Sequence, residues 1–178
     1  MRQKMLFTLL FLIVSLPEVR SQIRVGIKAP DFQLPYATKD TIIFEGLKLS
    51  DYFGKTAVLL AFYPADWSGG CTKEVCTLRD NFSQLSMLNA EVLGISGDYV
   101  FSHHEWAHHH NLPFKLLSDH SHSVAKLYES YNENSGFNKR TVFVIDSTGV
   151  IVYIDLHYDV NTAESFTKLH DAMIHMHK

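Results

Sequence analysis

One short segment, from Ala57 to Cys76, constrains the fold more than any other part of this chain of 178 residues. It begins with an uninterrupted apolar run, Ala57 to Tyr63, which predicts a buried strand. A proline and two glycines end that run, and a helical pattern starts at or just after Cys71. Loops beyond the carboxyl ends of buried strands form functional sites in α/β proteins, so we expect an α/β domain with a site at Cys71.

The position of Cys71 at the start of the predicted helix favours an ionised sulfur. Backbone N–H groups in the first turn of a helix have no partner within the helix, and the helix dipole places positive charge there. Both effects stabilise a thiolate, which is the nucleophilic form of cysteine. We therefore interpret Cys71 as a reactive cysteine. The alternative is a structural thiol that fills the core, a role that does not require a strand and a sharp turn just before it.

The residues around Cys71 fit a known pattern. Pro64, Ser68 and Cys71 have the arrangement P-x-x-x-[T/S]-x-x-C within the segment FYPADWSGGCTKEVC. This segment resembles the peroxiredoxins of the AhpC/TSA superfamily, and the second cysteine, Cys76, resembles their Q-type (bacterioferritin-comigratory) branch. The resemblance runs from about residue 25 to about residue 157, and it includes G-x-x-A-P-x-F at 26–32 and R-T-x-F-V-I-D at 140–146.

The resemblance implies a thioredoxin-like fold, and the order of the expected elements agrees with it. The order βαβαβ, then a β-hairpin and a last helix, suggests an α/β domain with a mixed central β-sheet and helices on both faces. Residues 22–40 are expected to form a loop because Pro30 and Pro35 interrupt regular structure. The expected strands are 41–47, 57–63, 90–96, 114–117, 140–145 and 150–157, and the expected helices are 72–89, 100–110, 124–131 and 162–175.

The resemblance also implies a thiol-dependent peroxidase that serves antioxidant defence and cell redox homeostasis. Cys71 would be the peroxidatic cysteine, which hydrogen peroxide or an organic hydroperoxide oxidises to a sulfenic acid. Cys76 would be the resolving cysteine, which condenses with that sulfenic acid to an intramolecular disulfide. A thioredoxin-like protein would then reduce the disulfide. The alternative for Cys76 is a buried helix cysteine in a protein with a one-cysteine mechanism.

Four further residues have roles that the resemblance implies. Ser68 would donate a hydrogen bond to the peroxide, and Pro64 would shield the sulfur from water. Arg140 would donate to both sulfur and peroxide, with Lys139 as a competing cation, and Glu74 would orient the arginine. The simpler alternatives are a helix cap for the serine, a strand terminator for the proline, a solvated charge for the arginine and a favourable first-turn carboxylate for the glutamate.

The spacing of the two cysteines predicts a redox-active pair rather than a structural disulfide. A bridge that closes so short a loop removes little chain entropy and stabilises weakly. Five residues along a helix advance about 7.5 Å and rotate by about 140°. The two Cα atoms are then roughly 8–9 Å apart, which exceeds the ~7 Å limit for a disulfide. A bond between Cys71 and Cys76 therefore requires the helix to unwind locally.

The N-terminus has the features of a secretory signal peptide. Arg2 and Lys4 precede an apolar run from Met5 to Leu16, and small or polar residues follow up to Ser21. The run is shorter than the roughly 20 apolar residues that span a bilayer. We therefore expect residues 1–21 to be a cleaved signal peptide, residues 22–178 to form the peroxiredoxin domain, and the protein to be exported, either periplasmic or secreted. An uncleaved anchor is the alternative.

Composition limits the partners. The net charge of −3 and the pI near 6.4 give no basic footprint for nucleic acid. We expect no cofactor or metal, no stable membrane insertion after signal cleavage, and a monomer or a homodimer. Seven histidines lie between residues 103 and 122, and His104 and His108 have an i,i+4 spacing that can hold a metal. No cysteine or carboxylate stands at a matching ligand spacing, so we interpret this segment as a solvated polar helix.

Two other functions compete with the peroxidase. A thiol–disulfide oxidoreductase needs W-C-x-x-C, and the segment Trp67 to Cys71 matches it except that Ser68 replaces the first cysteine. Without that thiolate the exchange reaction lacks its attacking group. The second competitor is a histidine-rich exported metal-binding protein, for which metal content after purification without a tag is the discriminating observation.

Overall fold

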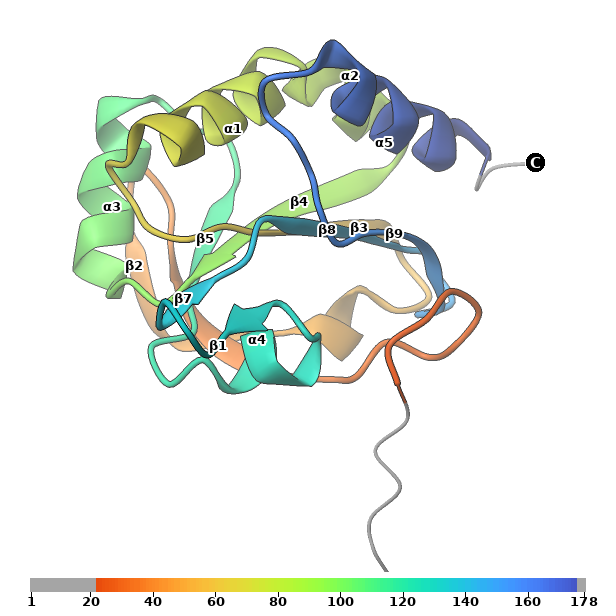
Figure 1. The fold of residues 1–178 in the computed structure, drawn as a ribbon, viewed down its shortest axis with the longest axis horizontal. Helices are drawn as coiled ribbons and strands as arrows, with labels where there is room; N and C mark the ends of the chain where they lie inside the picture. The colour runs from red at the N-terminus through yellow and green to blue at the C-terminus, as the bar shows by residue number, and fades with distance from the viewer. Residues whose placement is uncertain (1–21, 176–178) are drawn as a thin grey trace, which may run out of the picture.

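The computed structural model of the protein describes residues 22–175. The predicted signal peptide, residues 1–21, lies outside the described residues. The structure is built on a seven-stranded sheet in the order β2-β1-β5-β4-β3-β8-β9 (Figure 1). Its strands are β1 (Gln33–Ala37), β2 (Ile42–Lys48), β3 (Ala57–Phe62), β4 (Ala90–Ser96), β5 (Lys115–Ser118), β8 (Thr141–Ile145) and β9 (Ile151–Asp155).

The sheet is mixed, as the sequence predicts. Strand β3 pairs in parallel with β4, and β4 with β5, whereas β8 is antiparallel to β3 and β1 is antiparallel to β5. Parallel neighbours require crossover connections, which the helices supply. The helices are α1 (Gly69–Asp80), α2 (Phe82–Met87), α3 (Val100–His109), α4 (Ser123–Leu127) and α5 (Ala163–His175), with a short 3-10 helix, η1, at Leu49–Tyr52. Within residues 22–175, none of these helices is long and apolar enough to cross a bilayer.

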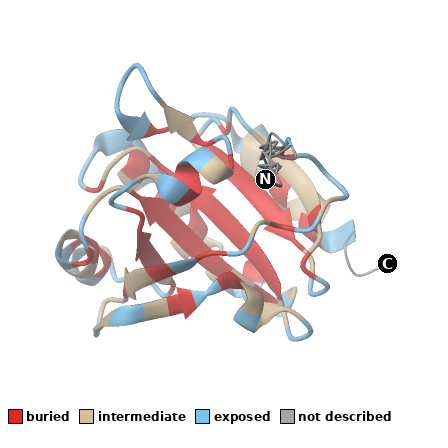
Figure 2. Cartoon of the chain, turned by 90° about the horizontal axis from the view of Figure 1, so that it is seen from below, coloured by how far each residue is buried: buried red, intermediate tan, exposed pale blue. Residues whose placement is uncertain are grey.

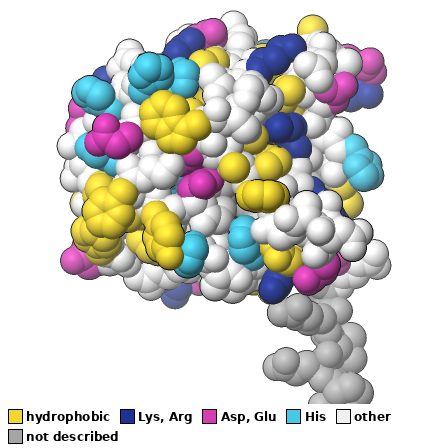
Figure 3. All heavy atoms as spheres, turned by 60° about the vertical axis from the view of Figure 1, so that its left-hand side comes forward, with side chains coloured by type: hydrophobic (Ala, Val, Ile, Leu, Met, Phe, Trp, Pro, Cys, Tyr) yellow, Lys and Arg dark blue, Asp and Glu magenta, His cyan; other side chains and the backbone are white. Residues whose placement is uncertain are grey.

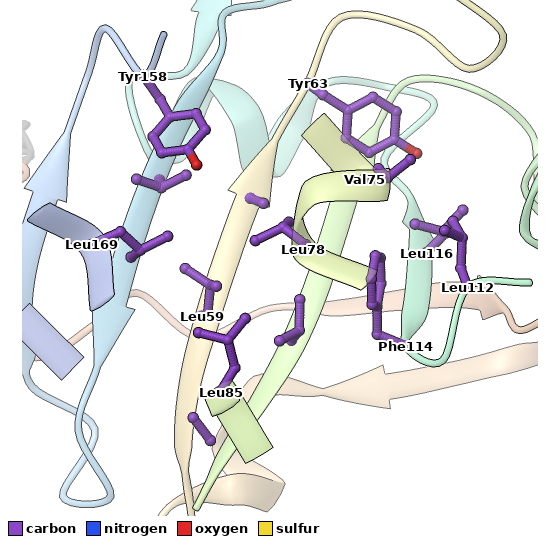
Figure 4. Close-up of a cluster of buried hydrophobic side chains, with 14 of the residues drawn as sticks. Leu59, Tyr63, Val75, Leu78, Leu85, Leu112, Phe114, Leu116, Tyr158 and Leu169 are labelled. Carbon is purple, nitrogen blue, oxygen red and sulfur yellow. The ribbon is translucent and has the colours of Figure 1, made fainter. Parts of the chain in front are cut away.

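Helices cover both faces of the sheet, which confirms the predicted thioredoxin-like architecture. Helices α1, α2, α3 and α5 lie on one face, and α4 lies on the other (Figure 1). The buried residues lie along the central strands (Figure 2). Under the first face, Leu59 of β3 packs with Leu78 of α1, Leu85 of α2 and Leu169 of α5 (Figure 4). Because every residue of β3 is buried, this strand holds the loop that follows it in a fixed place.

One strand lies where the sequence predicts a loop. Strand β1 pairs with β2 on one side and β5 on the other, although it contains Pro35. The register of β1 with β2 shifts between Leu34 and Tyr36, which places the proline at a bulge. A proline is tolerated there because a bulged residue does not have to donate to the ladder. The expectation of a loop over 22–40 was therefore wrong for 33–37.

The boundaries of several helices also differ from the prediction. The expected helix over 72–89 is two helices, α1 and α2, which meet at Asn81. Helix α1 begins at Gly69, earlier than the predicted start at or just after Cys71. Helix α4 ends at Leu127 instead of residue 131, and Glu129 then takes a positive φ of 57°. The chain next forms a two-stranded ribbon that was not predicted, with strands β6 (Tyr131–Asn132) and β7 (Phe137–Asn138).

Candidate active site

Cys71 is buried in the first turn of α1, just beyond the carboxyl end of β3. Ser68 occupies the N-cap position, so Cys71 is the third residue of the helix. The bond from the Thr72 N–H to the Ser68 carbonyl, 2.8 Å long, is the first of the helix. The N–H groups before it have no partner within the helix, and they give this end its positive potential. The structure therefore places the Cys71 sulfur where a thiolate is stabilised.

Arg140 supplies a cation to the same sulfur. Its Nη2 donates to Cys71 Sγ at 3.5 Å. The sheet fixes this contact, because Arg140 directly precedes β8, whose first residue, Thr141, pairs with Phe62 at the end of β3. Gly70 leaves room for the guanidinium, since a Cβ there would lie 3.1 Å from Nη2. Burial alone would lower the pKa of Arg140, but the negative charges of Glu74 and Cys71 raise it above its ordinary value.

Lys139, the competing cation, turns away from the cysteine. Its Nζ donates to the carbonyl oxygen of Glu129, 3.1 Å away. Adjacent residues of an extended chain point to opposite sides, so only one of the two cations can face α1. Arg140 is the residue that does so.

Glu74 holds the other side of the Arg140 guanidinium. Arg140 Nη1 donates to Glu74 Oε2. The Glu74 side chain is only 1% exposed, and its Oε1 has no hydrogen-bond partner among the described residues. Burial raises the pKa of Glu74 to about 7, against the opposing effect of Arg140. Glu74 is therefore a buried partner of the arginine. The alternative interpretation, a carboxylate favoured in the first turn of a helix, does not account for this burial or for the contact with Arg140.

The other three residues singled out from the sequence do not bond to Cys71. Ser68 is exposed, and its hydroxyl donates to the Ala65 carbonyl at 3.1 Å instead of capping the helix. Pro64 is half-buried in the turn between β3 and α1. Cys76 is also half-buried, and it lies against His110 of the neighbouring helix. Cys71 and Cys76 are both free thiols on one continuous helix.

Comparison with known proteins agrees with this geometry. The sequence model of the AhpC/TSA family matches residues 25–154. The chain is 43% identical over 155 residues to a Coxiella burnetii protein named as a peroxiredoxin bcp, with 83% of this chain and 99% of that protein covered. It is 38% identical over 136 residues to peroxiredoxin Bcp of Bacillus subtilis, with 73% and 83% covered. The chain belongs to the AhpC/TSA family.

Solved structures agree on the fold of this peroxiredoxin. Peroxidoxin BcpB from Mycobacterium tuberculosis matches with a TM-score of 0.73 and 28% identity, over 86% of this chain and 98% of that one. The AhpC of Enterococcus faecalis matches with a TM-score of 0.74 and 23% identity, over 85% and 92%. The predictions of a thioredoxin-like fold, of Q-type relatives and of thiol-dependent peroxidase activity are thus confirmed.

The sequence did not reveal a buried polar cluster that fixes the loop of this peroxiredoxin before Cys71. Asp66 Oδ2 lies 2.8 Å from His103 Nδ1, and both side chains are almost completely buried. The Tyr63 hydroxyl donates to Asp66 Oδ1 at 2.8 Å, and the Ser102 hydroxyl donates to Oδ2 at 2.8 Å. His103 Nε2 donates to the Leu117 carbonyl at 3.1 Å. The two ring nitrogens of His103 therefore join the Asp66 carboxylate on one side to the backbone of β5 on the other.

The interpretation of the histidine-rich segment as a solvated helix is therefore wrong for His103. Several other histidines do lie at the surface of the face that carries α3 (Figure 3). His104 and His108, the pair with metal-ligand spacing, donate to the carbonyls of Thr38 and Lys39 at 2.9 and 3.3 Å. No group of three or more histidine, cysteine or acidic side chains in residues 22–175 is arranged to hold a metal ion.

The pKa of Glu74 predicts a pH dependence of stability. It lies at about 7 in the folded protein, above its ordinary value of 4.5, so the folded protein retains a proton that the unfolded chain releases between these two values. The free energy of unfolding should therefore fall as pH rises from 4.5 to 7, by on the order of 3 kcal/mol from this group. In Glu74→Gln the free energy of unfolding, measured with urea between pH 4.5 and 7, should not show this decrease.

The matched control is Glu105→Gln, which changes an exposed glutamate on α3. It should unfold with the same pH slope as the unmodified protein. Parallel curves for Glu74→Gln and the unmodified protein would contradict the raised pKa.

Proposed function

We propose that this protein reduces peroxides through Cys71, which becomes a sulfenic acid, and that Cys76 resolves it as an intramolecular disulfide. The observation that carries the proposal is the contact of Arg140 Nη2 with the buried Cys71 Sγ, 3.5 Å away, at the start of a helix. A cation and unpaired N–H groups both stabilise a thiolate. The family supplies the reaction class, and this contact supports Cys71 as the sulfur that performs it.

In the first step the Cys71 thiolate attacks one oxygen of the peroxide. An S–O bond forms and the O–O bond breaks, which oxidises the sulfur by two electrons and releases water or an alcohol. Arg140 can donate to the departing oxygen while Glu74 holds its guanidinium in place. Ser68 can supply a second donor by rotating its hydroxyl away from Ala65, and Pro64 can shield the sulfur from water. Hydrogen peroxide and organic hydroperoxides both fit this chemistry.

In the second step Cys76 has to reach Cys71, which the folded helix opposes. Both lie in α1, and the ideal helical separation of roughly 8–9 Å between their Cα atoms is too long for a disulfide. Cys71 faces Arg140, whereas Cys76 faces His110. The first turns of α1 must therefore unwind before the bond can form. Both cysteines belong to one chain, so the step does not require a second copy.

Unwinding would also expose the disulfide to a reductant. We propose a thioredoxin-like protein for this role, because its dithiol can attack an accessible disulfide and close the cycle. We further propose that residues 1–21 direct export and are then removed. The charged, apolar and small-residue regions of that segment support this. The cycle would then run outside the cytosol, with an exported reductant.

The assignment of the two cysteines is tested by their variants. Cys71→Ser should abolish peroxide consumption, because a hydroxyl cannot replace the thiolate. Cys76→Ala should complete one turnover and stop at the Cys71 sulfenic acid. Stopped-flow measurement of peroxide loss, with mass spectrometry of the product, distinguishes the two. Peroxide consumption by Cys71→Ser at the rate of the unmodified protein would contradict the proposal.

Local unwinding is tested by amide hydrogen exchange in the reduced and oxidised protein. The oxidised form should exchange faster at Thr72 to Leu78, because a Cys71–Cys76 bond is incompatible with the intact helix. Helix α3 serves as an internal reference and should keep its protection. Equal protection of α1 in both forms, with the intramolecular disulfide verified by mass spectrometry, would refute the unwinding step.

A further inference from the structure

Cys76 lies in a contact that the peroxide step does not use. Its Sγ is 3.9 Å from Nδ1 of His110, the residue that caps the C-terminal end of α3. Arg79, one turn further along α1, donates from Nη1 to the His110 carbonyl at 2.8 Å. This bond ties the second half of α1 to the end of α3. It keeps the imidazole beside the thiol and leaves the first turns of α1 free to unwind.

We propose that His110 is the base that takes the thiol proton from Cys76 during the resolving step. This inference rests on the proposed function, in which Cys76 attacks the oxidised Cys71. An ordinary thiol is mostly protonated at neutral pH, yet only the thiolate attacks sulfur efficiently. A proton acceptor in direct contact with the thiol removes this obstacle. His110 is a catalytic residue in this sense, because its ring nitrogen touches a reacting atom.

The step balances in atoms and electrons. The Cys76 S–H proton passes to His110 Nδ1, which leaves a thiolate and an imidazolium. The thiolate then attacks Sγ of the Cys71 sulfenic acid, so an S–S bond forms and the S–O bond breaks. The hydroxide that leaves takes the proton from the imidazolium, directly or through solvent, and departs as water. His110 returns to its neutral form, and the oxidising equivalents come from the peroxide.

The charges around His110 suit a base. Burial, then the neighbouring His109 and then Arg79 lower the pKa of His110 below its ordinary value of 6.5, so the ring is neutral at neutral pH. The titratable and charged groups that face it are Cys76 and Arg79 from α1 and His109 from α3. Arg79 also places a positive charge near Cys76.

The ring of His110 is held by aromatic neighbours as well as by the backbone contact of Arg79. It packs against the Trp106 ring at 6.0 Å and the Trp67 ring at 6.3 Å, measured between ring centroids. Trp67 belongs to the loop that leads to Cys71. Oxidation that moves this loop should therefore change tryptophan fluorescence, which gives the resolving step an optical signal.

The test separates the two chemical steps in His110→Gln, which keeps a polar side chain but removes the base. After one equivalent of peroxide, stopped-flow tryptophan fluorescence should show a first phase within about twofold of the unmodified protein. The second phase, identified as disulfide formation by thiol alkylation and mass spectrometry, should slow by about 100-fold, as for the loss of a general base. In the unmodified protein this second rate should rise with pH as His110 loses its proton, and the midpoint of that rise should lie below pH 6.5. In His110→Gln it should keep rising into the alkaline range.

His108→Gln is the matched control, because His108 is an exposed histidine of α3 whose Nδ1 bonds to the Lys39 carbonyl and not to Cys76. Both of its phases should match those of the unmodified protein.

Added imidazole should restore the second phase in His110→Ala, an effect that a purely structural role would not produce. A second phase in His110→Gln with the rate and pH profile of the unmodified protein would overturn the proposal for His110 alone. An oxidised protein that carries no Cys71–Cys76 disulfide by mass spectrometry would overturn the resolving role of Cys76, and the role of His110 with it.

Discussion

The contact of Arg140 with Cys71 is the interaction on which the account of this protein depends. One guanidinium donates to the buried sulfur from Nη2 and to the buried Glu74 carboxylate from Nη1. Each of the three groups would be costly to bury alone, because an unpaired charge loses its hydration. Together they place the Arg140 guanidinium against a carboxyl group and a nucleophile that lie one helical turn apart. The arrangement that stabilises the folded site also holds a cation beside the Cys71 sulfur.

The central sheet is what makes this contact possible. The loop that leads to Cys71 follows the last residue of β3, and Arg140 directly precedes the first residue of β8, which runs in the opposite direction. Because the two strands are antiparallel neighbours, the last residue of β3 lies beside the first residue of β8. The buried pair of Asp66 and His103 then fixes the loop between β3 and α1. Backbone pairing sets the coarse position of the site, and side-chain hydrogen bonds set the fine position.

The sequence was sufficient for the architecture and for the residues around Cys71. The apolar run of β3, the turn after it and the family pattern led to the fold and to Arg140 and Glu74, which the structure brings together. It was insufficient for β1, because a proline inside an interior strand is tolerated at a bulge, and the position of a bulge depends on how two strands pair. It also missed His103 and His110. Nothing in a run of histidines distinguishes the ring that turns inward to Asp66, or the one that faces Cys76, from solvated neighbours.

The most direct test of the account is the ultraviolet absorbance of the Cys71 thiolate in a Cys76→Ala background, with and without Arg140→Met. Loss of the cation should lower the thiolate fraction at neutral pH and slow the first reaction with peroxide by roughly a hundred- to a thousandfold, as expected for one aligned donor. Lys139→Met, which removes the neighbouring cation that faces away from the site, should change neither quantity. An unchanged thiolate fraction and an unchanged rate in Arg140→Met would contradict the account.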